Sequence, residues 1–257
     1  MGSLLEKLSF VFLHGFLGQP SDWDLIIQNL RTEFPQYNYL AVDYFNSPPL
    51  SPKMDFKKWS ENFVDFLGAE FGNFPVVLVG YSLGGRLALQ ALKNFPDKFP
   101  FIFLISTNPG FQSTEIDERK HRLQEDQKWS QRFLVDDWKS LIKDWNAQQV
   151  FQGSIEEPER VSSNYKRDLL SKAIIKWSVA NQEDLRPLMV THQKKITWIV
   201  GDLDKKYIQM TKEIFKVCPD MNYSICPNSS HRVLIDNPTE LSRSINRILK
   251  KVLKYFQ

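Results

Sequence analysis

Short apolar runs alternate with longer amphipathic stretches through the first half of the chain. The apolar runs cover residues 8–13, 37–44, 76–80 and 101–106, and the stretches with helical periodicity cover 22–34, 55–71 and 85–95. Strand-length and helix-length segments in this order need crossover connections, which are typical of a parallel sheet. The runs are apolar at successive positions, as expected of strands covered on both faces. The pattern predicts an α/β fold with a mostly parallel sheet and helices on both faces.

The pattern changes after residue 110. Residues 111–190 keep helical periodicity and many charges but show no strand pattern, and an apolar run resumes the sheet at 195–204. A short strand at 222–226 and a closing helix at 238–254 complete the chain's pattern. We therefore predict one domain, with a core made of residues 1–110 and 191–257 and a helical lid inserted at 111–190. A separate helical domain is the alternative, although a segment of this length barely supports a core of its own.

Composition and charge exclude several classes of protein. The chain has 257 residues, of which 42% are hydrophobic and 25% charged, as expected of a globular protein. The net charge of +3 comes from interspersed residues, with one short basic end at 249–256, so we expect no nucleic-acid partner. The apolar stretch 8–16 is too short to cross a bilayer and lacks signal-peptide features. We expect no membrane span and a cytoplasmic location.

The two cysteines give no sign of a metal or redox site. Cys218 and Cys226 form no CxxC pair and have no histidine cluster beside them. We read them as reduced thiols of the core or its rim, and we predict neither a metal nor an organic cofactor. The sequence leaves the oligomeric state open.

A candidate nucleophile follows the apolar run 76–80. The motif Gly-Tyr-Ser-Leu-Gly at residues 80–84, set between a strand and a helix, is the nucleophile elbow of the G-x-S-x-G type. The serine of such a motif sits on a tight, strained turn, so small residues are needed where strand and helix backbones crowd together. Gly85 adds further clearance. Ser82 is therefore predicted to stand above the sheet edge, at the start of the next helix.

A serine nucleophile needs a histidine base that a carboxylate orients, and in this kind of fold the acid precedes the histidine along the chain. Of the four histidines, His231 lies in the loop after the last strand and is the predicted base. The other three histidines are less suitable. His14 precedes the serine, His121 lies in a charged helix of the lid, and His192 comes just before a strand, at the end of the sheet away from the site. Asp204, after the strand at 195–204, is the predicted acid. Asp202 remains the alternative, with a turn or cap as its other role.

Developing negative charge also needs hydrogen-bond donors. The backbone N–H of Leu83, directly after the serine, is one predicted donor. The N–H of Phe16, in the loop after the first strand, is the other. Gly15 permits that loop to turn, and His14 is expected to brace it.

These motifs resemble the α/β-hydrolase superfamily along nearly the whole chain. A narrower resemblance is to the 2-succinyl-6-hydroxy-2,4-cyclohexadiene-1-carboxylate synthase family, which eliminates pyruvate from an enolpyruvyl precursor in menaquinone biosynthesis. It rests on the joint occurrence of the segments FLHGFLG, GYSLGGRLAL, STNPGF, ERKHRLQED, WSQRFL, DWNAQQVF and GDLDKKY. The sequence departs from the family pattern at DYFNSPPLSP, where Asp43 stays but the glycines are lost. The late lid is also shorter and less rich in glycine.

The resemblance implies a triad of Ser82, His231 and Asp204 and a small-molecule substrate that carries several carboxylates. It also implies substrate contacts or neighbours of the site, namely Tyr81, Arg86, Arg122, Trp145, Arg167, Lys206 and Tyr207. Arginine suits this substrate because its planar guanidinium grips a carboxylate with two hydrogen bonds. Three of these assignments have plainer alternatives: an ion pair of Arg122 with Asp126, lid packing for Trp145 and a surface charge for Arg167.

The reaction implied is a carbon–oxygen lyase reaction in which the serine acts as a base. A serine hydrolase of esters, thioesters or a C–C bond is the first alternative, because the same triad serves both reactions. An inactive binding module is the second alternative, and the presence of all three triad residues speaks against it.

Overall fold

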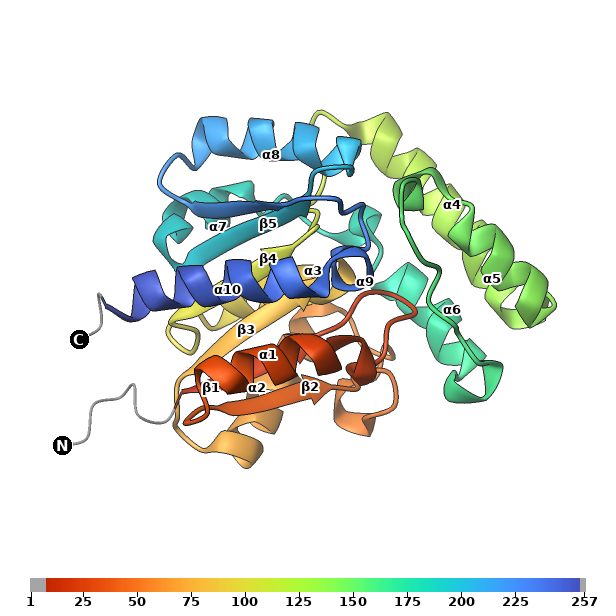
Figure 1. Cartoon of the computed structure of the whole chain (residues 1–257). Coiled ribbons are helices and arrows are strands. Elements are labelled where there is room, and N and C mark those ends of the chain that lie inside the picture. Colours follow the sequence, from red (N-terminus) through yellow and green to blue (C-terminus); the bar gives the residue numbers. More distant parts are fainter. Residues whose placement is uncertain (1–7, 255–257) are drawn as a thin grey trace.

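Six parallel strands form a single sheet through the centre of the protein (Figure 1). The computed structural model describes residues 8–254. The strands are β1 Ser9–Leu13, β2 Asn38–Val42, β3 Val76–Tyr81, β4 Phe101–Ile105, β5 Ile196–Gly201 and β6 Asn222–Cys226, and their order in the sheet is β2-β1-β3-β4-β5-β6. Every neighbouring pair is parallel. The predicted fold class is confirmed.

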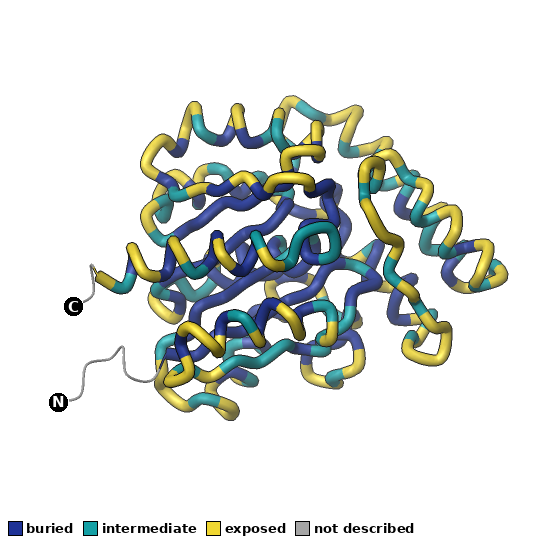
Figure 2. The backbone as a smooth tube through the Cα atoms, in the orientation of Figure 1, coloured by how far each residue is buried: buried dark blue, intermediate teal, exposed yellow. Residues whose placement is uncertain are grey.

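Alternate strand residues enter two apolar cores, one on each face of the sheet. In β1, Val11 and Leu13 join one core, and Phe10 and Phe12 join the other. Successive side chains of a strand point to opposite faces, so a strand covered on both sides must be apolar at every position. This is why the inner strands β1, β3, β4 and β5 read as nearly continuous apolar runs, and Figure 2 shows this part of the sheet buried beneath more exposed helices. The edge strands β2 and β6 are partly exposed, so the expectation of burial on both faces is wrong for them.

The helices divide between the two faces. Helices α1 (Asp24–Glu33) and α10 (Pro238–Leu253) pack against each other over one core. Helices α2 (Phe56–Phe71) and α3 (Leu83–Asn94) pack together over the other core, which also receives residues of α8 (Lys205–Val217). Among the described helices, none combines the length and hydropathy that a bilayer span requires.

The segment between β4 and β5 is helical, without a strand. It contains α4 (Ile116–Val135), α5 (Trp138–Asn146), α6 (Arg167–Lys176) and α7 (Arg186–Thr191), and α4 packs against α6. Figure 1 shows α4, α5 and α6 beyond the carboxyl ends of the strands. α7 instead contacts α8 of the core. The predicted lid boundaries at 111 and 190 stay a prediction.

Two helices of the C-terminal part have no counterpart in the sequence-based pattern. These are α8, between β5 and β6, and the short α9 (Val233–Asp236). The sequence did contain a signal for α8. Asp204 is a good N-cap residue, and the helical spacing of Tyr207, Thr211 and Ile214 places them on one side, which the structure shows to be buried. Cys218 and Cys226 are buried and unpaired. The last residues of the basic end, 255–257, lie outside the described residues.

The order of the strands reverses between β1 and β3. The chain runs from β1 to β2 on one side and then to β3 on the other side, so the loops after β1 and β3 separate. In open parallel sheets, ligands bind beside the carboxyl ends of strands at such a reversal of strand order. Phe16 follows β1 and Ser82 follows β3, so both predicted site loops lie at this position.

Candidate active site

Ser82 stands on a sharp turn between β3 and α3. Its φ of 50° and ψ of −107° lie in a region that L-residues rarely adopt. The turn is possible because strand and helix backbones meet without side chains between them: a Cβ added to Gly80 would lie 2.6 Å from the Gly84 carbonyl oxygen. A Cβ on Gly84 itself would lie 2.0 Å from the carbonyl oxygen of Leu13. The glycines at these positions are therefore a steric requirement of the turn.

Replacing Gly84 by alanine is expected to lower the free energy of unfolding by about 3 kcal/mol or more, because the new methyl group overlaps a backbone atom that cannot move freely. Gly68→Ala is the matched control. Its Cβ would meet nothing within 4 Å in helix α2, so alanine there should raise stability by about 0.5–1 kcal/mol. Urea denaturation of both variants measures the difference, and equal stabilities would contradict the steric account.

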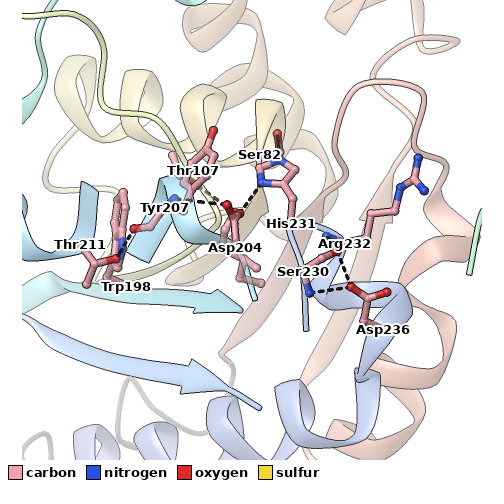
Figure 3. Close-up of polar contacts among 11 residues, drawn as sticks. Ser82, Thr107, Trp198, Asp204, Tyr207, Thr211, Ser230, His231, Arg232 and Asp236 are labelled. Carbon is pink, nitrogen blue, oxygen red and sulfur yellow. Dashed lines mark hydrogen bonds and ion pairs between the residues drawn. The ribbon is translucent and has the colours of Figure 1, made fainter. Parts of the chain in front are cut away.

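The structure brings together the three residues predicted as a triad (Figure 3). The Ser82 Oγ lies 3.1 Å from the His231 Nε2, and the His231 Nδ1 lies 2.9 Å from an Asp204 carboxylate oxygen. The histidine and the aspartate are buried. These contacts form one hydrogen-bonded line in which a proton can pass from the hydroxyl to the imidazole while the carboxylate holds the ring.

Asp204 has a second structural role. It is the N-cap of α8, and its other carboxylate oxygen accepts a hydrogen bond from the backbone N–H of Tyr207 at 3.2 Å. A helix N-terminus favours a negative charge, so α8 both stabilises and orients this carboxylate. Asp202, the alternative acid, instead accepts a hydrogen bond from the N–H of Ser229 at 3.0 Å. The structure gives Asp202 a role in holding the loop after β6.

Two backbone donors next to Ser82 lack partners. Among the described residues, neither the N–H of Leu83 nor that of Phe16 makes a hydrogen bond within the protein. The Phe16 N–H and the Gly15 carbonyl belong to the same peptide group. The Gly15 carbonyl accepts from the His14 Nδ1 at 2.8 Å and from the Gly18 N–H at 3.0 Å. These bonds fix the orientation of the peptide. The site can therefore offer two donors to an oxyanion.

His14 braces this loop as a neutral residue. It is buried, its ring stacks on Tyr44 at 4.2 Å, and the Tyr44 hydroxyl donates to the His14 carbonyl. Burial, the largest cause, lowers the pKa of His14 to about 4. The Nδ1 that faces the Gly15 carbonyl must carry the proton of the neutral ring, since a carbonyl oxygen only accepts.

The buried His14 predicts a loss of stability in mild acid. Its pKa is about 4 in the folded chain and about 6.5 when unfolded, so between these values the unfolded state binds more protons. The free energy of unfolding is therefore unaffected by this histidine above pH 6.5 and falls as the pH drops towards 4, by up to about 3 kcal/mol. The variant His14→Phe, which keeps a ring beside Tyr44, should show a flatter dependence over this range. Denaturation at pH 7 and pH 4.5 measures it, and parallel profiles would contradict it.

Cationic side chains lie near the triad. Arg86 donates to the Trp177 carbonyl, and Arg122 binds Asp126 with two contacts of 2.9 Å. Burial and the nearby Arg122 lower the pKa of Arg86 to about 10. Desolvation and Arg122 also lower the pKa of Lys206. Arg122 disfavours the charged forms of both Arg86 and Lys206, and an anion bound beside Arg122 would relieve this repulsion.

Arg122 forms the ion pair with Asp126 that was the alternative to a substrate contact. The pair does not lie on a fully solvated helix face, however. Asp126 is buried and also accepts from the Ser178 hydroxyl at 2.6 Å. The Arg122 side chain keeps 40% of its surface exposed. Asp126 therefore holds the arginine by its Nε, which leaves the terminal nitrogens available for a ligand.

Aromatic rings enclose the histidine and the oxyanion loop. Tyr207 and Tyr81 lie 4.7 and 5.6 Å from the His231 ring, between centroids. Burial raises the pKa of Tyr207 to about 12 and that of Tyr81 further still, so both hydroxyls are neutral. Trp145 packs 5.0 Å from Phe16. Its ring also lies 4.9 and 5.6 Å from those of Trp129 and Phe133, so Trp145 packs within the insertion and contacts the oxyanion loop.

Arg167 is bound at the end of α4 through its guanidinium group. Its guanidinium donates to the carbonyls of Phe133, Arg132 and Asp136, where α4 ends. A cation at a helix C-terminus compensates the carbonyl dipoles that have no partner. Among the described residues it makes no recorded contact with the triad, and it is not a free surface charge either.

Sequence reasoning missed three residues near the site. Tyr44 supports the oxyanion loop, the ring of Phe151 lies 6.0 Å from that of His231, and Asp236 binds the residue before His231. Tyr44 had a signal, since it directly follows Asp43 at the end of an apolar run, and so did Phe151, the last residue of the segment DWNAQQVF. Within residues 8–254 no group of three histidine, cysteine or acidic side chains is placed to hold a metal ion.

Comparisons with known proteins agree with this architecture. The model of the alpha/beta hydrolase fold matches residues 9–140. A protein of Escherichia coli K12 named 2-succinyl-6-hydroxy-2,4-cyclohexadiene-1-carboxylate synthase is 27% identical over 250 residues, covering 93% of each chain.

Solved structures share the fold. The structure of MenH from S. aureus has a TM-score of 0.80 at 21% identity and covers 95% of this chain and 94% of its own. An esterase from Thermogutta terrifontis has a TM-score of 0.71 at 14% identity, covering 95% and 90%. The parallel sheet, the serine turn and the family match over half of the sequence together establish that this chain belongs to the α/β hydrolase family.

Proposed function

We propose that this protein is a carbon–oxygen lyase of menaquinone biosynthesis. It would eliminate pyruvate from 2-succinyl-5-enolpyruvyl-6-hydroxy-3-cyclohexene-1-carboxylate to give 2-succinyl-6-hydroxy-2,4-cyclohexadiene-1-carboxylate. The observation that carries the proposal is a Ser82–His231–Asp204 line with Arg86, Arg122 and Lys206 nearby. The full-length likeness to synthases of this name supports the choice of reaction.

The proposed reaction begins with proton transfer. His231 accepts the proton of Ser82, and the serine oxygen removes a proton from the ring carbon next to a carbonyl. The electrons of that C–H bond form a new ring double bond to the neighbouring carbon, the electrons of the existing ring double bond shift by one position, and the C–O bond to the enolpyruvyl group breaks. Protonated His231 gives its proton to the departing oxygen, and the enol so formed becomes pyruvate. The Phe16 and Leu83 N–H groups stabilise the enolate-like charge. Positioned proton transfer contributes about 10²- to 10⁴-fold, and oxyanion donors about as much again.

The cations have a separate task in this proposal. The substrate carries several carboxylates, and an anion bound near Arg122 would relieve the repulsion that Arg122 exerts on Arg86 and on Lys206. Tyr207 and Tyr81 remain neutral beside His231, so neither competes as a base. The cations would bind and orient the substrate, and the triad would move the protons.

The variant Arg122→Gln is expected to raise KM for the enolpyruvyl precursor by about 10- to 100-fold, since a hydrogen bond to a charged group contributes roughly 1.5–3 kcal/mol. The effect on kcat should be small. Lys128→Gln removes the same charge from an exposed position of α4, where Lys128 pairs with Glu125. That control should leave KM nearly unchanged. Steady-state kinetics decides, and equal KM values for the two variants would contradict a substrate contact.

A serine hydrolase is the second candidate function. The two unpaired N–H groups beside the Ser82 hydroxyl are also suited to the tetrahedral intermediate of acyl transfer. The two functions differ in the substrate that the cations favour. Turnover of p-nitrophenyl esters alongside the enolpyruvyl precursor tests this, and esters turned over faster than the precursor would favour the hydrolase.

A further inference from the structure

The segment between α5 and α6, residues 147–166, connects two parts of the site. We call it the strap. It contains only two short 3₁₀ turns, Gln149–Phe151 and Ser162–Asn164. Near its middle, the hydroxyl of Ser154 and the N–H of Ile155 donate to one carboxylate oxygen of Asp236, at 2.8 and 2.9 Å. The strap is thus bound to α9 of the core.

The other carboxylate oxygen of Asp236 binds the loop that carries the histidine. It accepts from both the N–H and the hydroxyl of Ser230, at 2.8 and 2.6 Å (Figure 3). The Ser230 hydroxyl in turn accepts from the N–H of Arg232 at 3.2 Å. The backbone on both sides of His231 is therefore held through one carboxylate.

Arg232 makes a parallel connection. Its guanidinium donates to the side-chain oxygen of Asn146, at the end of α5, and lies 4.1 Å from the ring centroid of Phe151 in the strap. The Phe151 ring lies 6.0 Å from the His231 ring. Both neighbours of His231 along the chain are thus tied to the insertion, Ser230 through Asp236 and Arg232 directly.

The far end of the strap is held independently of the histidine. Arg160 binds both carboxylate oxygens of Asp22, at 2.8 and 2.9 Å, and both side chains are nearly buried. The hydroxyl of Tyr165 donates to the Leu17 carbonyl at 2.9 Å. Among the described residues, neither Arg160 nor Tyr165 makes a hydrogen bond with residues 228–236. Replacing Arg160 therefore loosens the strap and leaves the four hydrogen bonds of Asp236 in place.

We propose that Asp236 is a positioning residue for His231, which it keeps in line between Ser82 and Asp204 by joining the strap to the histidine loop. The inference rests on the proposed role of His231 as the base. Each carboxylate oxygen receives two donors, so the loop and the strap are fixed relative to each other. Displacing a reacting group by about 1 Å can cost about 100-fold in rate.

The kinetic test compares Asp236→Ala with Arg160→Gln in the full-length protein. Asp236→Ala should lower kcat for pyruvate release by about 10- to 100-fold while KM changes less than about threefold, since the cations stay in place. Arg160→Gln removes the other attachment and should leave kcat within about threefold of wild type. If Arg160→Gln reproduced the loss of kcat, order of the strap as a whole would be responsible and the proposal would fall.

A spectroscopic test does not depend on the reaction. The chain has four histidines, so ¹⁵N-histidine labelling gives a simple NMR spectrum in which His231→Gln identifies the His231 signals. The Nδ1–H signal of His231, hydrogen-bonded to Asp204, should broaden or shift in Asp236→Ala and persist in Arg160→Gln. A folded Asp236→Ala protein with an unchanged signal and unchanged kcat would overturn the proposal.

Two further outcomes are separable. If the wild-type protein releases no pyruvate, the proposed function fails, and the NMR comparison still decides the role of Asp236. If Asp236→Ala does not fold, Ser230→Ala replaces it, because this variant removes the hydroxyl between Asp236 and the Arg232 N–H and leaves both strap contacts. It should alter the same His231 signal, and an unaltered signal would count against Asp236.

Discussion

Ser82→Ala is expected to lower kcat for pyruvate release by about 10⁴-fold or more. The hydroxyl is the group at the end of the Ser82–His231–Asp204 line that faces the substrate, and removing one member of such a unit costs nearly as much as removing all of it. Substrate binding should persist, because the cations and the Phe16 and Leu83 donors stay. A coupled assay with lactate dehydrogenase measures pyruvate, and calorimetry measures binding to the inactive variant.

Ser106→Ala is the matched control for this variant. Ser106 also follows a strand, has a left-handed φ of 44°, is buried, and its hydroxyl has no partner among the described residues. Loss of that hydroxyl should leave kcat nearly unchanged. If Ser82→Ala kept appreciable turnover, the serine would not be the base and the proposed mechanism would be wrong.

Asp204→Asn is expected to lower kcat by about 10⁴-fold with little loss of stability. The asparagine oxygen can still accept from the Tyr207 N–H and cap α8. Its amide group would then donate to the His231 Nδ1, which would place the ring proton on Nε2. The imidazole would face Ser82 with a proton already bound and could not accept another.

Asp202→Asn separates the two carboxylates that the sequence left open. Within residues 8–254, the Asp202 carboxylate accepts a single hydrogen bond, from the N–H of Ser229, and its replacement should change kcat less than about threefold. The pair of variants is assayed for pyruvate release and for unfolding in urea. A large loss of kcat in Asp202→Asn together with an active Asp204→Asn would reverse the assignment of the acid.

The sequence predicted the features that local pattern controls. Strands buried on both faces are apolar throughout, so β1 and β3 could be located from their residues alone, and a tight turn between strand and helix needs the glycines around Ser82. The order of serine, acid and histidine then selected His231 and left Asp204 as the preferred acid with Asp202 as the alternative, and the structure places Asp204 in contact with His231.

Contacts between segments that are distant in the sequence could not be predicted, because they leave no local pattern. Arg160 pairs with Asp22, 138 positions away, and Asp236 binds Ser154, 82 positions away. Arg167 shows the same limit in another form. The family resemblance suggested a substrate contact for Arg167, but its guanidinium reaches three carbonyls at the end of α4. No feature of residues 160–170 indicates that helix end.

The double role of Asp204 has a consequence for protein engineering. One carboxylate oxygen caps the N-terminus of α8 and the other accepts from His231, so a single carboxylate serves both the helix and the triad. A redesign that moves the acid to another position therefore needs a serine, threonine or asparagine as the new N-cap of α8. Without it, the variant would lose the capping hydrogen bond of α8 as well as the original partner of His231.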